Sequence, residues 1–330
     1  MDGTGTPSQP SNSGSSADRL REKLERELGR SVMDLLRDPT VVEIMLNPDG
    51  VLWVERQGKQ MEEIGRMASH SALSVMATVA TFLHTEITRE KPILECELPI
   101  DGSRFAALRP PVVSAPTFAI RTKAKRIFTL QEYVDSGIMS PMQMQQLLSA
   151  VRSRKNILVV GGTGSGKTTL SNAIIHAISQ EHPNDRILII EDTGELQCAA
   201  ANAVVMRAVE DVTMERLLKA SLRLRPDRIL VGEVRDGSAL TLIEAWNTGH
   251  PGGIATIHSD VGDPEAALLR MESLVARATQ APQQALIAKA VNVIASIAKT
   301  ANGRKVHAIT EVTGYDSLKN TYSFQHGDET

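Results

Sequence analysis

The sequence KNILVVGGTGSGKTTLSN at residues 155–172 constrains the fold more than any other stretch of this chain. A short apolar run precedes a glycine-rich loop, and a segment with helical periodicity follows it. Gly161, Gly166, Lys167 and Thr168 match the pattern G-x-x-x-x-G-K-[ST]. A strand, this loop and a helix in that order predict a site where backbone N–H groups surround the phosphates of a nucleotide. A fortuitous glycine turn is disfavoured because both flanking elements are present.

Each residue type in this loop meets a physical requirement of triphosphate binding. The glycines lack Cβ atoms and adopt a wide range of backbone angles, so the loop can close around the phosphates. Lys167 brings a positive charge to the β- and γ-phosphates, and the Thr168 hydroxyl can hold Mg²⁺ at the first helical turn. We therefore predict ATP and Mg²⁺ as the ligands. The predicted nucleotide-binding residues are Gly161, Gly162, Thr163, Gly164, Ser165, Gly166, Lys167, Thr168 and Thr169.

Composition and periodicity divide the chain into four parts. Residues 1–17 are rich in Gly, Ser, Pro and Thr, which predicts a disordered tail. Residues 18–121 predict a small α+β domain, because helical stripes occur together with alternating strand patterns. Residues 122–140 predict a linker that includes most of the basic stretch RTKAKR as a hinge. Residues 141–330 predict a larger α/β domain that carries the phosphate loop.

The sequence predicts the order of helices and strands in the α+β domain. We expect a helix at 18–37, a β-hairpin at 41–56 with a third strand near 61–64, and a second helix at 69–84. Apolar segments between residues 93 and 123, cut by Asp-Gly and Pro-Pro turns, predict antiparallel strands.

Two capping boxes predict the starts of two helices just before the phosphate loop. Thr129 is followed by Glu132 three residues later, and Ser140 by Gln143, with a proline at the first position of the second helix. Beyond them, apolar strands alternate with helical segments to the end of the chain. This alternation predicts a largely parallel sheet with helices on its faces and ligands at the carboxyl ends of its strands.

Acidic residues follow two of these predicted strands. The strand RILII ends in Glu191, Asp192 and, after a short turn, Glu195, and the strand RILVG ends in Glu233. Carboxylates beside a triphosphate repel it unless Mg²⁺ or water lies between them, so Glu195 and Glu233 are candidates to orient the attacking water. Glu233 is also a candidate to hold Mg²⁺ through water. Glu191 and Asp192, taken singly, fit solvated turn residues equally well.

Histidines and arginines complete the candidate list. His250 and His258 flank the short strand GGIATI, which suggests a sensor for the γ-phosphate or a neighbouring carboxylate. A metal site made of these two histidines and Asp263 is the less favoured alternative. The first domain offers arginines in DGSRF, RPP and FAIRT, of the kind that stabilises charge on a transferred phosphoryl group. These arginines are Arg104, Arg109 and Arg121.

The overall composition argues against direct nucleic-acid binding. Lys and Arg number 36 against 39 Asp and Glu, for a net charge of −3, and aromatic residues make up only 3%. Cys96 and Cys198 have no C-x-x-C partner, so neither a disulfide framework nor a zinc site is expected. No apolar run reaches the ~18 residues of a membrane span and no signal sequence is visible, which predicts a cytoplasmic protein.

Four motifs together, GGTGSGKT, IIEDTGEL, LVGEVRDGSA and TGHPGGIATIHS, resemble those of the secretion-ATPase superfamily in order and spacing. The resemblance implies a RecA-like P-loop NTPase domain preceded by the smaller domain, and ATP hydrolysis in a homo-hexameric ring. It implies a Walker A box at the phosphate loop, an aspartate box ending at Glu195, a Walker B strand ending at Glu233, and a histidine box from His250 to His258. It also implies that Arg104 and Arg121 approach bound nucleotide. Catalytic roles are thus predicted for Lys167, Glu195, Glu233, Arg104, Arg121, His250 and His258.

Within this superfamily, the opening LNPDGVLWVER most resembles the conjugative, type IV secretion branch. The resemblance implies a motor that energises a secretion or conjugation machine, attached to the inner membrane through partner proteins. The alternatives are a type II secretion ATPase, a type IV pilus assembly ATPase, a nucleic-acid motor of the RecA or helicase type, and a scaffold that binds nucleotide without hydrolysis.

Overall fold

A computed structural model describes most of the chain as two compact units, Met1–Lys125 and Arg126–Thr330. The predicted disordered tail lies outside the described residues up to position 15, and so do two positions of the predicted hinge. The residues described are 16–123, 126–209, 211–259, 263–301 and 303–326.

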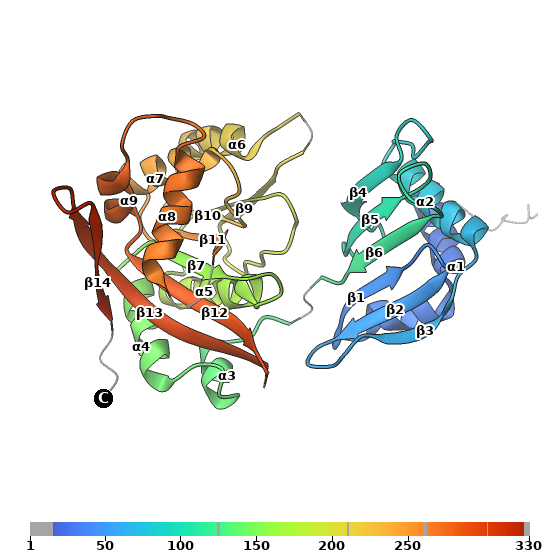
Figure 1. The fold of residues 1–330 in the computed structure, drawn as a ribbon, viewed down its shortest axis with the longest axis horizontal. Coiled ribbons are helices and arrows are strands. Elements are labelled where there is room, and N and C mark those ends of the chain that lie inside the picture. The colour runs from blue at the N-terminus through green and yellow to red at the C-terminus, as the bar shows by residue number, and fades with distance from the viewer. Residues whose placement is uncertain (1–15, 124–125, 210, 260–262, 302, 327–330) are drawn as a thin grey trace, which may run out of the picture. The chain divides into compact units, whose positions relative to one another are not determined.

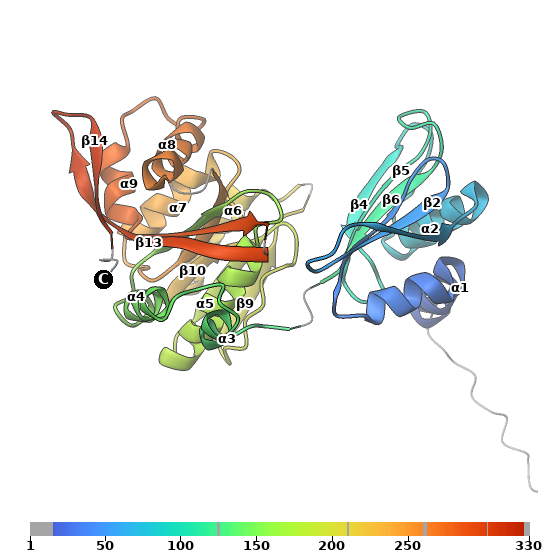
Figure 2. The same cartoon turned by 60° about the horizontal axis from the view of Figure 1, so that its bottom comes forward.

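The first unit is a helix-covered antiparallel sheet (Figure 1). Its elements are α1 (Ser16–Arg37), β1 (Val41–Leu46), β2 (Val51–Arg56), β3 (Glu62–Arg66), α2 (Ser69–Phe82), β4 (Ile93–Glu97), β5 (Arg104–Leu108) and β6 (Thr117–Arg121). Within the described residues the strands form one six-stranded sheet in the order β3-β2-β1-β6-β5-β4. Helices α1 and α2 pack together on one face of it (Figures 1 and 2).

The predicted amphipathic helix at the start of this unit is confirmed. Leu24, Leu28, Val32 and Leu36 are all buried against the sheet, although the non-helical backbone of Gly29 (φ 76°, ψ 164°) divides α1 into two helical segments. The helix begins at Ser16, two residues before the predicted start, so the predicted tail ends earlier than residue 17. The predicted hairpin, third strand, second helix and later antiparallel strands are also present.

The second unit is an α/β structure. Its elements are α3 (Leu130–Asp135), α4 (Pro141–Arg152), β7 (Ile157–Gly161), α5 (Lys167–Glu181), β8 (Ile187–Glu191), β9 (Ala203–Arg207), α6 (Met214–Ser221), η1 (Leu222–Leu224), β10 (Arg228–Val231), α7 (Ser238–Asn247), β11 (Ile254–His258), α8 (Pro264–Val275), α9 (Gln284–Ala290), β12 (Val293–Thr300), β13 (Gly303–Asp316) and β14 (Thr321–His326). Over the described ranges its sheet has eight strands in the order β14-β13-β12-β7-β11-β10-β8-β9. Pairings among β12, β7, β11, β10, β8 and β9 are parallel, whereas β13 and β14 pair antiparallel.

Helices cover both faces of this sheet because its central strands are apolar throughout. All five residues of β7 are buried. Leu158 and Val160 point into a core shared with α7, α8 and α9, whereas Ile157 and Val159 point into a core shared with α3, α4 and α5. This two-sided burial is characteristic of parallel sheets in α/β proteins, and it confirms the predicted fold class.

The structure confirms the two helix starts predicted ahead of the phosphate loop. Both capping boxes, at Thr129 and Ser140, are present with their reciprocal hydrogen bonds. Helix α9 was not predicted, because its seven residues are too few for a clear periodic pattern. No helix in the described parts of the chain combines the length and apolarity needed to cross a membrane.

Candidate active site

The phosphate loop connects β7 to α5. It lies on the side of the sheet where the parallel strands have their carboxyl ends, here called the carboxyl edge; the opposite side, with their amino ends, is the amino edge. Gly164 and Gly166 have φ values of +68° and +100°, which side chains other than glycine rarely adopt. Gly161 has no room for a Cβ atom, which would lie 2.2 Å from the carbonyl oxygen of Ile297. Helix α5 has Gly166 as its N-cap and receives no side-chain cap, so its first-turn N–H groups face the loop. The loop therefore has the form of an anion-binding turn.

The charged and hydroxyl groups predicted for phosphate and Mg²⁺ lie within this loop. The Lys167 ammonium donates hydrogen bonds to the carbonyl oxygens of Gly161 and Gly162, each at 2.9 Å. The Thr168 hydroxyl donates to Glu195 Oε2 at 3.0 Å. A hydroxyl and a carboxylate in contact form the kind of oxygen pair that Mg²⁺ prefers, directly or through water. The residues present therefore fit MgATP.

Buried polar contacts fix the position of the Glu195 backbone. The Glu191 carboxylate accepts hydrogen bonds from the backbone N–H of Glu195 at 2.8 Å and of Leu196 at 3.0 Å. Asn172 donates to the Glu195 carbonyl at 3.1 Å and accepts from the Gln197 N–H at 2.9 Å. Glu191 is only 1% exposed, so its interpretation as a solvated turn residue is wrong. It holds the turn that presents Glu195 to Thr168.

Arg235 connects the acids that follow β8 and β10. Its guanidinium donates to Glu233 Oε2 at 2.6 Å and to Asp192 Oδ2 at 2.8 Å. Partial burial lowers the pKa of Arg235, but the hydrogen bond and the charges of Glu233, Asp192 and Glu195 outweigh it and raise the pKa overall. Arg235 thus gathers with Asp192, Glu195 and Glu233 at the carboxyl edge of the sheet, where the sequence predicted the three acids but not the arginine.

The two histidines do not meet. His258 pairs in register with Gly161, the first residue of the phosphate loop. His250 precedes β11, and its Nδ1 lies 2.9 Å from the carbonyl oxygen of Pro226, at the amino edge of the sheet. The four steps from Ile254 to His258 alone span about 13 Å of extended strand. Within a single chain only His258 of the predicted sensor pair lies beside the loop, and among the described residues the two histidines do not form the alternative metal site.

Around His250, the amino edge of the sheet holds a separate charged cluster. Arg228 is fully buried and donates to Asp185 Oδ2 at 2.7 Å and to the Gly252 carbonyl at 2.9 Å. Arg154 donates to Asp185 Oδ1 at 2.5 Å. Burial raises the pKa of Asp185, but hydrogen bonds from the two arginines outweigh it and hold the pKa below its usual range. A Cβ at Gly252 would lie 2.2 Å from Arg228 Nη1, so this glycine serves packing rather than catalysis.

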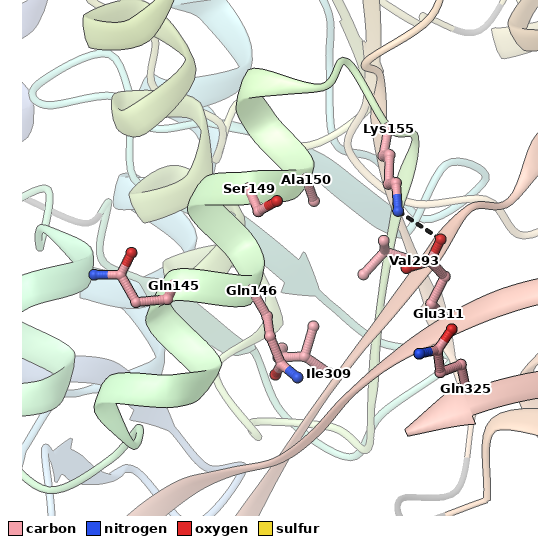
Figure 3. A pocket seen from close by; sticks show the side chains of 9 residues that line it. All are labelled: Gln145, Gln146, Ser149, Ala150, Lys155, Val293, Ile309, Glu311 and Gln325. Atoms are coloured by element: carbon pink, nitrogen blue, oxygen red, sulfur yellow. Dashed lines mark hydrogen bonds and ion pairs between the residues drawn. The ribbon is translucent and has the colours of Figure 1, made fainter. Parts of the chain in front are cut away.

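A cavity of about 340 Å³ also lies toward this end of β7 (Figure 3). Glutamines of α4 line one side, and residues of β12, β13 and β14 line the other. Lys155 and Glu311 form an ion pair at 2.5 Å on its wall. Because Lys155 precedes β7 and the phosphate loop follows it, the cavity and the loop are at opposite ends of the strand. It is not the nucleotide site.

The predicted arginines belong to the first unit. Arg104 and Arg121 are directly opposite in the register of β5 and β6, and Glu43 of β1 is opposite Arg121. Their neighbours Phe105 and Ile120 point into the core beneath α1 and α2, so the charged row lies on the other face of the sheet. Burial raises the pKa of Glu43, while both arginines act to lower it. Arg109 instead donates to the Ile87 carbonyl at 3.1 Å, a contact within the unit.

Sequence reasoning missed several residues that contact the site. Asn172 lies one helical turn after Thr168, so its i, i+4 spacing was a usable signal. Arg235 follows Glu233 by two residues, which was a weaker signal. Arg304 of β13 donates from Nε to the carbonyl oxygen of Gly164 at 3.3 Å, across 140 residues of sequence, and no local pattern predicts that.

Comparison with known proteins gives consistent results. The family model described as "Type II/IV secretion system protein" matches residues 26–318. A probable conjugal transfer protein TrbB of Sinorhizobium fredii is 52% identical over 294 residues, which cover 89% of this chain and 90% of that protein. The type IV secretion system protein VirB11 of Bartonella quintana is 34% identical over 266 residues, covering 68% of this chain and 74% of that protein. The Legionella pneumophila ATPase DotB has the same fold, with a TM-score of 0.60 at 18% identity over 91% of this chain and 81% of that one.

Proposed function

Because this chain belongs to the family of type II/IV secretion system proteins, we propose that it is an ATP-hydrolysing motor of a type IV secretion or conjugative transfer apparatus. The observation that carries the proposal is the contact between Thr168 and Glu195 beside Lys167, within a phosphate loop. The similarity to a conjugal transfer protein over most of both chains supports the conjugative branch over type II secretion and pilus assembly.

The phosphate loop binds and orients the triphosphate in this proposal. Backbone N–H groups of the loop and of the first turn of α5 surround the phosphate oxygens. Lys167 exchanges its two carbonyl partners for the β- and γ-phosphate oxygens, which carry full negative charge. Thr168 would hold Mg²⁺, and the ion would supply positive charge that neutralises the phosphates.

The two glutamates have separate roles in this proposal. Glu195 contacts the Thr168 hydroxyl, so it positions the metal side of the site. Glu233 accepts a hydrogen bond from Arg235, which holds its carboxylate in a fixed direction. A fixed carboxylate at the end of this strand accepts a hydrogen bond from the attacking water and orients it. His258, next to Gly161 in register, remains a candidate sensor of the γ-phosphate.

The assembly and its partners belong to the same proposal. The chain forms a homo-hexamer and works on the cytoplasmic side of the inner membrane, attached through membrane components of the secretion machine. Arg104 and Arg121 supply positive charge to the transferred phosphoryl group, in their own chain or in a neighbour. Because they lie directly opposite each other on β5 and β6, we expect both arginines to approach the same group.

Steady-state phosphate release by the purified full chain tests this function. We expect turnover that requires both ATP and Mg²⁺, from a particle whose mass by light scattering is that of six chains. A chain that binds MgATP and releases no phosphate, alone or with membrane fractions of a conjugating cell, would contradict the enzyme assignment. A monomer at working concentration would contradict the ring.

A further inference from the structure

The strands β12 and β13 form a hairpin whose tip reaches the phosphate loop. Strand β12 pairs with β7 up to Ser296 opposite Val160, and there its own pairing with β13 shifts register. Beyond the shift, the Ile297 carbonyl lies where a Cβ on Gly161 would be. The hairpin thus forms a wall beside the loop.

Arg304, on β13 near the hairpin tip, contacts that loop with its side chain. Its Nε donates to the Gly164 carbonyl at 3.3 Å. Its Cδ lies 2.9 Å from the place where a Cβ on Gly166 would stand, so the two can approach only because residue 166 is glycine. Arg304 binds the loop through a backbone carbonyl, so this contact occupies none of the loop N–H groups that phosphate would need.

The residues that follow Arg304 on β13 contact the α3–α4 segment of the second unit. Two residues along β13, the Val306 N–H donates to the Ile138 carbonyl at 2.8 Å, in the turn between α3 and α4. Gln143 of α4 donates to the carbonyls of Val306 and His307, each at 3.2 Å. Burial raises the pKa of Tyr133 on α3, and the charge of Arg304 opposes that rise, which places the guanidinium near this helix.

We propose that Arg304 is a positioning residue that holds the phosphate loop in its binding shape and ties it, through β13, to the α3–α4 segment. The inference rests on the proposed function only in that the loop must bind nucleotide. A loop held by this contact has already lost conformational freedom that binding would otherwise remove. In this proposal Arg304 acts through the loop backbone and not on the phosphates.

The test compares Arg304→Ala with Lys305→Ala in the full chain. Lys305 is the neighbouring residue, is exposed and carries the same charge, so it is a matched control. We expect Arg304→Ala to raise the Kd for MgADP, measured by calorimetry, about fivefold, the usual net effect of one lost hydrogen bond. The KM for MgATP should rise by a similar factor, with a smaller change in kcat. An unchanged Kd, or the same change in both variants, would overturn the proposal.

A second variant separates position from charge. Arg304→Lys keeps the positive charge and the aliphatic stem but has no donor at the position of Nε. We expect it to bind MgADP as weakly as Arg304→Ala. Recovery of wild-type affinity would show that only charge matters, and the positioning role would be wrong.

Hydrogen exchange of the loop amides gives a readout that needs no nucleotide. In Arg304→Ala, amides between residues 161 and 168 should exchange faster than in Lys305→Ala, while amides of β8 stay unchanged. If the wild-type chain bound no nucleotide, the proposed function would fail and this comparison would still decide the inference. Equal exchange in the two variants would refute it.

Discussion

The amino edge and the carboxyl edge of the eight-stranded sheet carry similar residue types but differ in how deeply those residues are buried. At the amino edge, Arg228 and Arg154 share the carboxylate of Asp185. At the carboxyl edge, Arg235 joins Glu233 to Asp192. Both are groups of arginine and acid at strand ends, and sequence composition alone does not separate them.

Burial separates the two edges. The Arg228 side chain is 0% exposed, and the backbone carbonyl of Gly252 takes a further hydrogen bond from it. The side chains of Arg235 and Glu233 are 49% and 23% exposed, so solvent and ligand can reach them. A buried charge whose partners are all protein groups fixes a structure, whereas a partly exposed one can exchange a protein partner for a phosphate or a water. The charges at the amino edge therefore stabilise the fold, whereas those at the carboxyl edge are accessible to a ligand.

The largest expected effect tests the structural role of the amino edge. Arg228→Ala leaves the Asp185 carboxylate buried with a single arginine partner and removes a large buried side chain. We expect the free energy of unfolding in urea to fall by about 3–5 kcal/mol. Arg154→Ala is the control, since its side chain is 37% exposed, and it should lose much less. A drop below about 1 kcal/mol for Arg228→Ala would remove the distinction between the edges.

A pair of lysines at the two ends of β7 tests the carboxyl edge. Lys167→Ala removes the charge that faces the phosphates, and we expect kcat for ATP hydrolysis to fall by about a hundredfold or more. Lys155→Ala removes the same group beyond the other end of the strand, where Lys155 pairs with Glu311. We expect this control to keep wild-type turnover. Normal turnover by Lys167→Ala would refute the site.

The two glutamates sharpen the comparison within the carboxyl edge. Glu233→Gln should lower kcat by about a hundredfold, because an amide orients the attacking water poorly. Glu195→Gln should instead raise the Mg²⁺ concentration needed for half-maximal turnover, because its contact is with Thr168. Turnover measured across a Mg²⁺ titration distinguishes the variants. If Glu195→Gln changed only kcat and Glu233→Gln only the Mg²⁺ midpoint, their roles would be reversed.

Local patterns in the sequence predicted the elements and the side of the sheet on which the site lies. The glycine loop, its flanking strand and the acids after two later strands follow from short-range chemistry. The sequence favoured Glu195 over Glu191 as a site residue, but it did not show that Glu195 meets Thr168. That contact depends on burial of Glu191 and on a turn whose N–H groups it holds.

Two errors have instructive physical causes. His250 was grouped with His258, although the strand between them was itself predicted, and a strand of that length separates its ends. The glycines after His250 serve packing, because Gly252 makes room for Arg228 and a Cβ at Gly253 would lie 2.2 Å from the Trp246 ring nitrogen. Arg304 was missed because its contact joins segments that only the completed sheet brings together.

The smallest expected effect concerns pH. The pKa of Asp185 lies below its usual range in the folded chain, so its ionised form is stabilised by folding. That stabilisation is fully present above the unfolded pKa of about 3.9 and is lost as the pH falls through the folded value. Asp185→Asn should therefore be less stable than wild type by a constant amount between pH 5 and pH 7 in urea titrations. Below about pH 4 the difference should shrink, because the wild-type carboxyl also becomes neutral. A difference that persisted unchanged to pH 2 would show that the two arginines bind a neutral group equally well, and the amino edge would then be held together by packing rather than by charge.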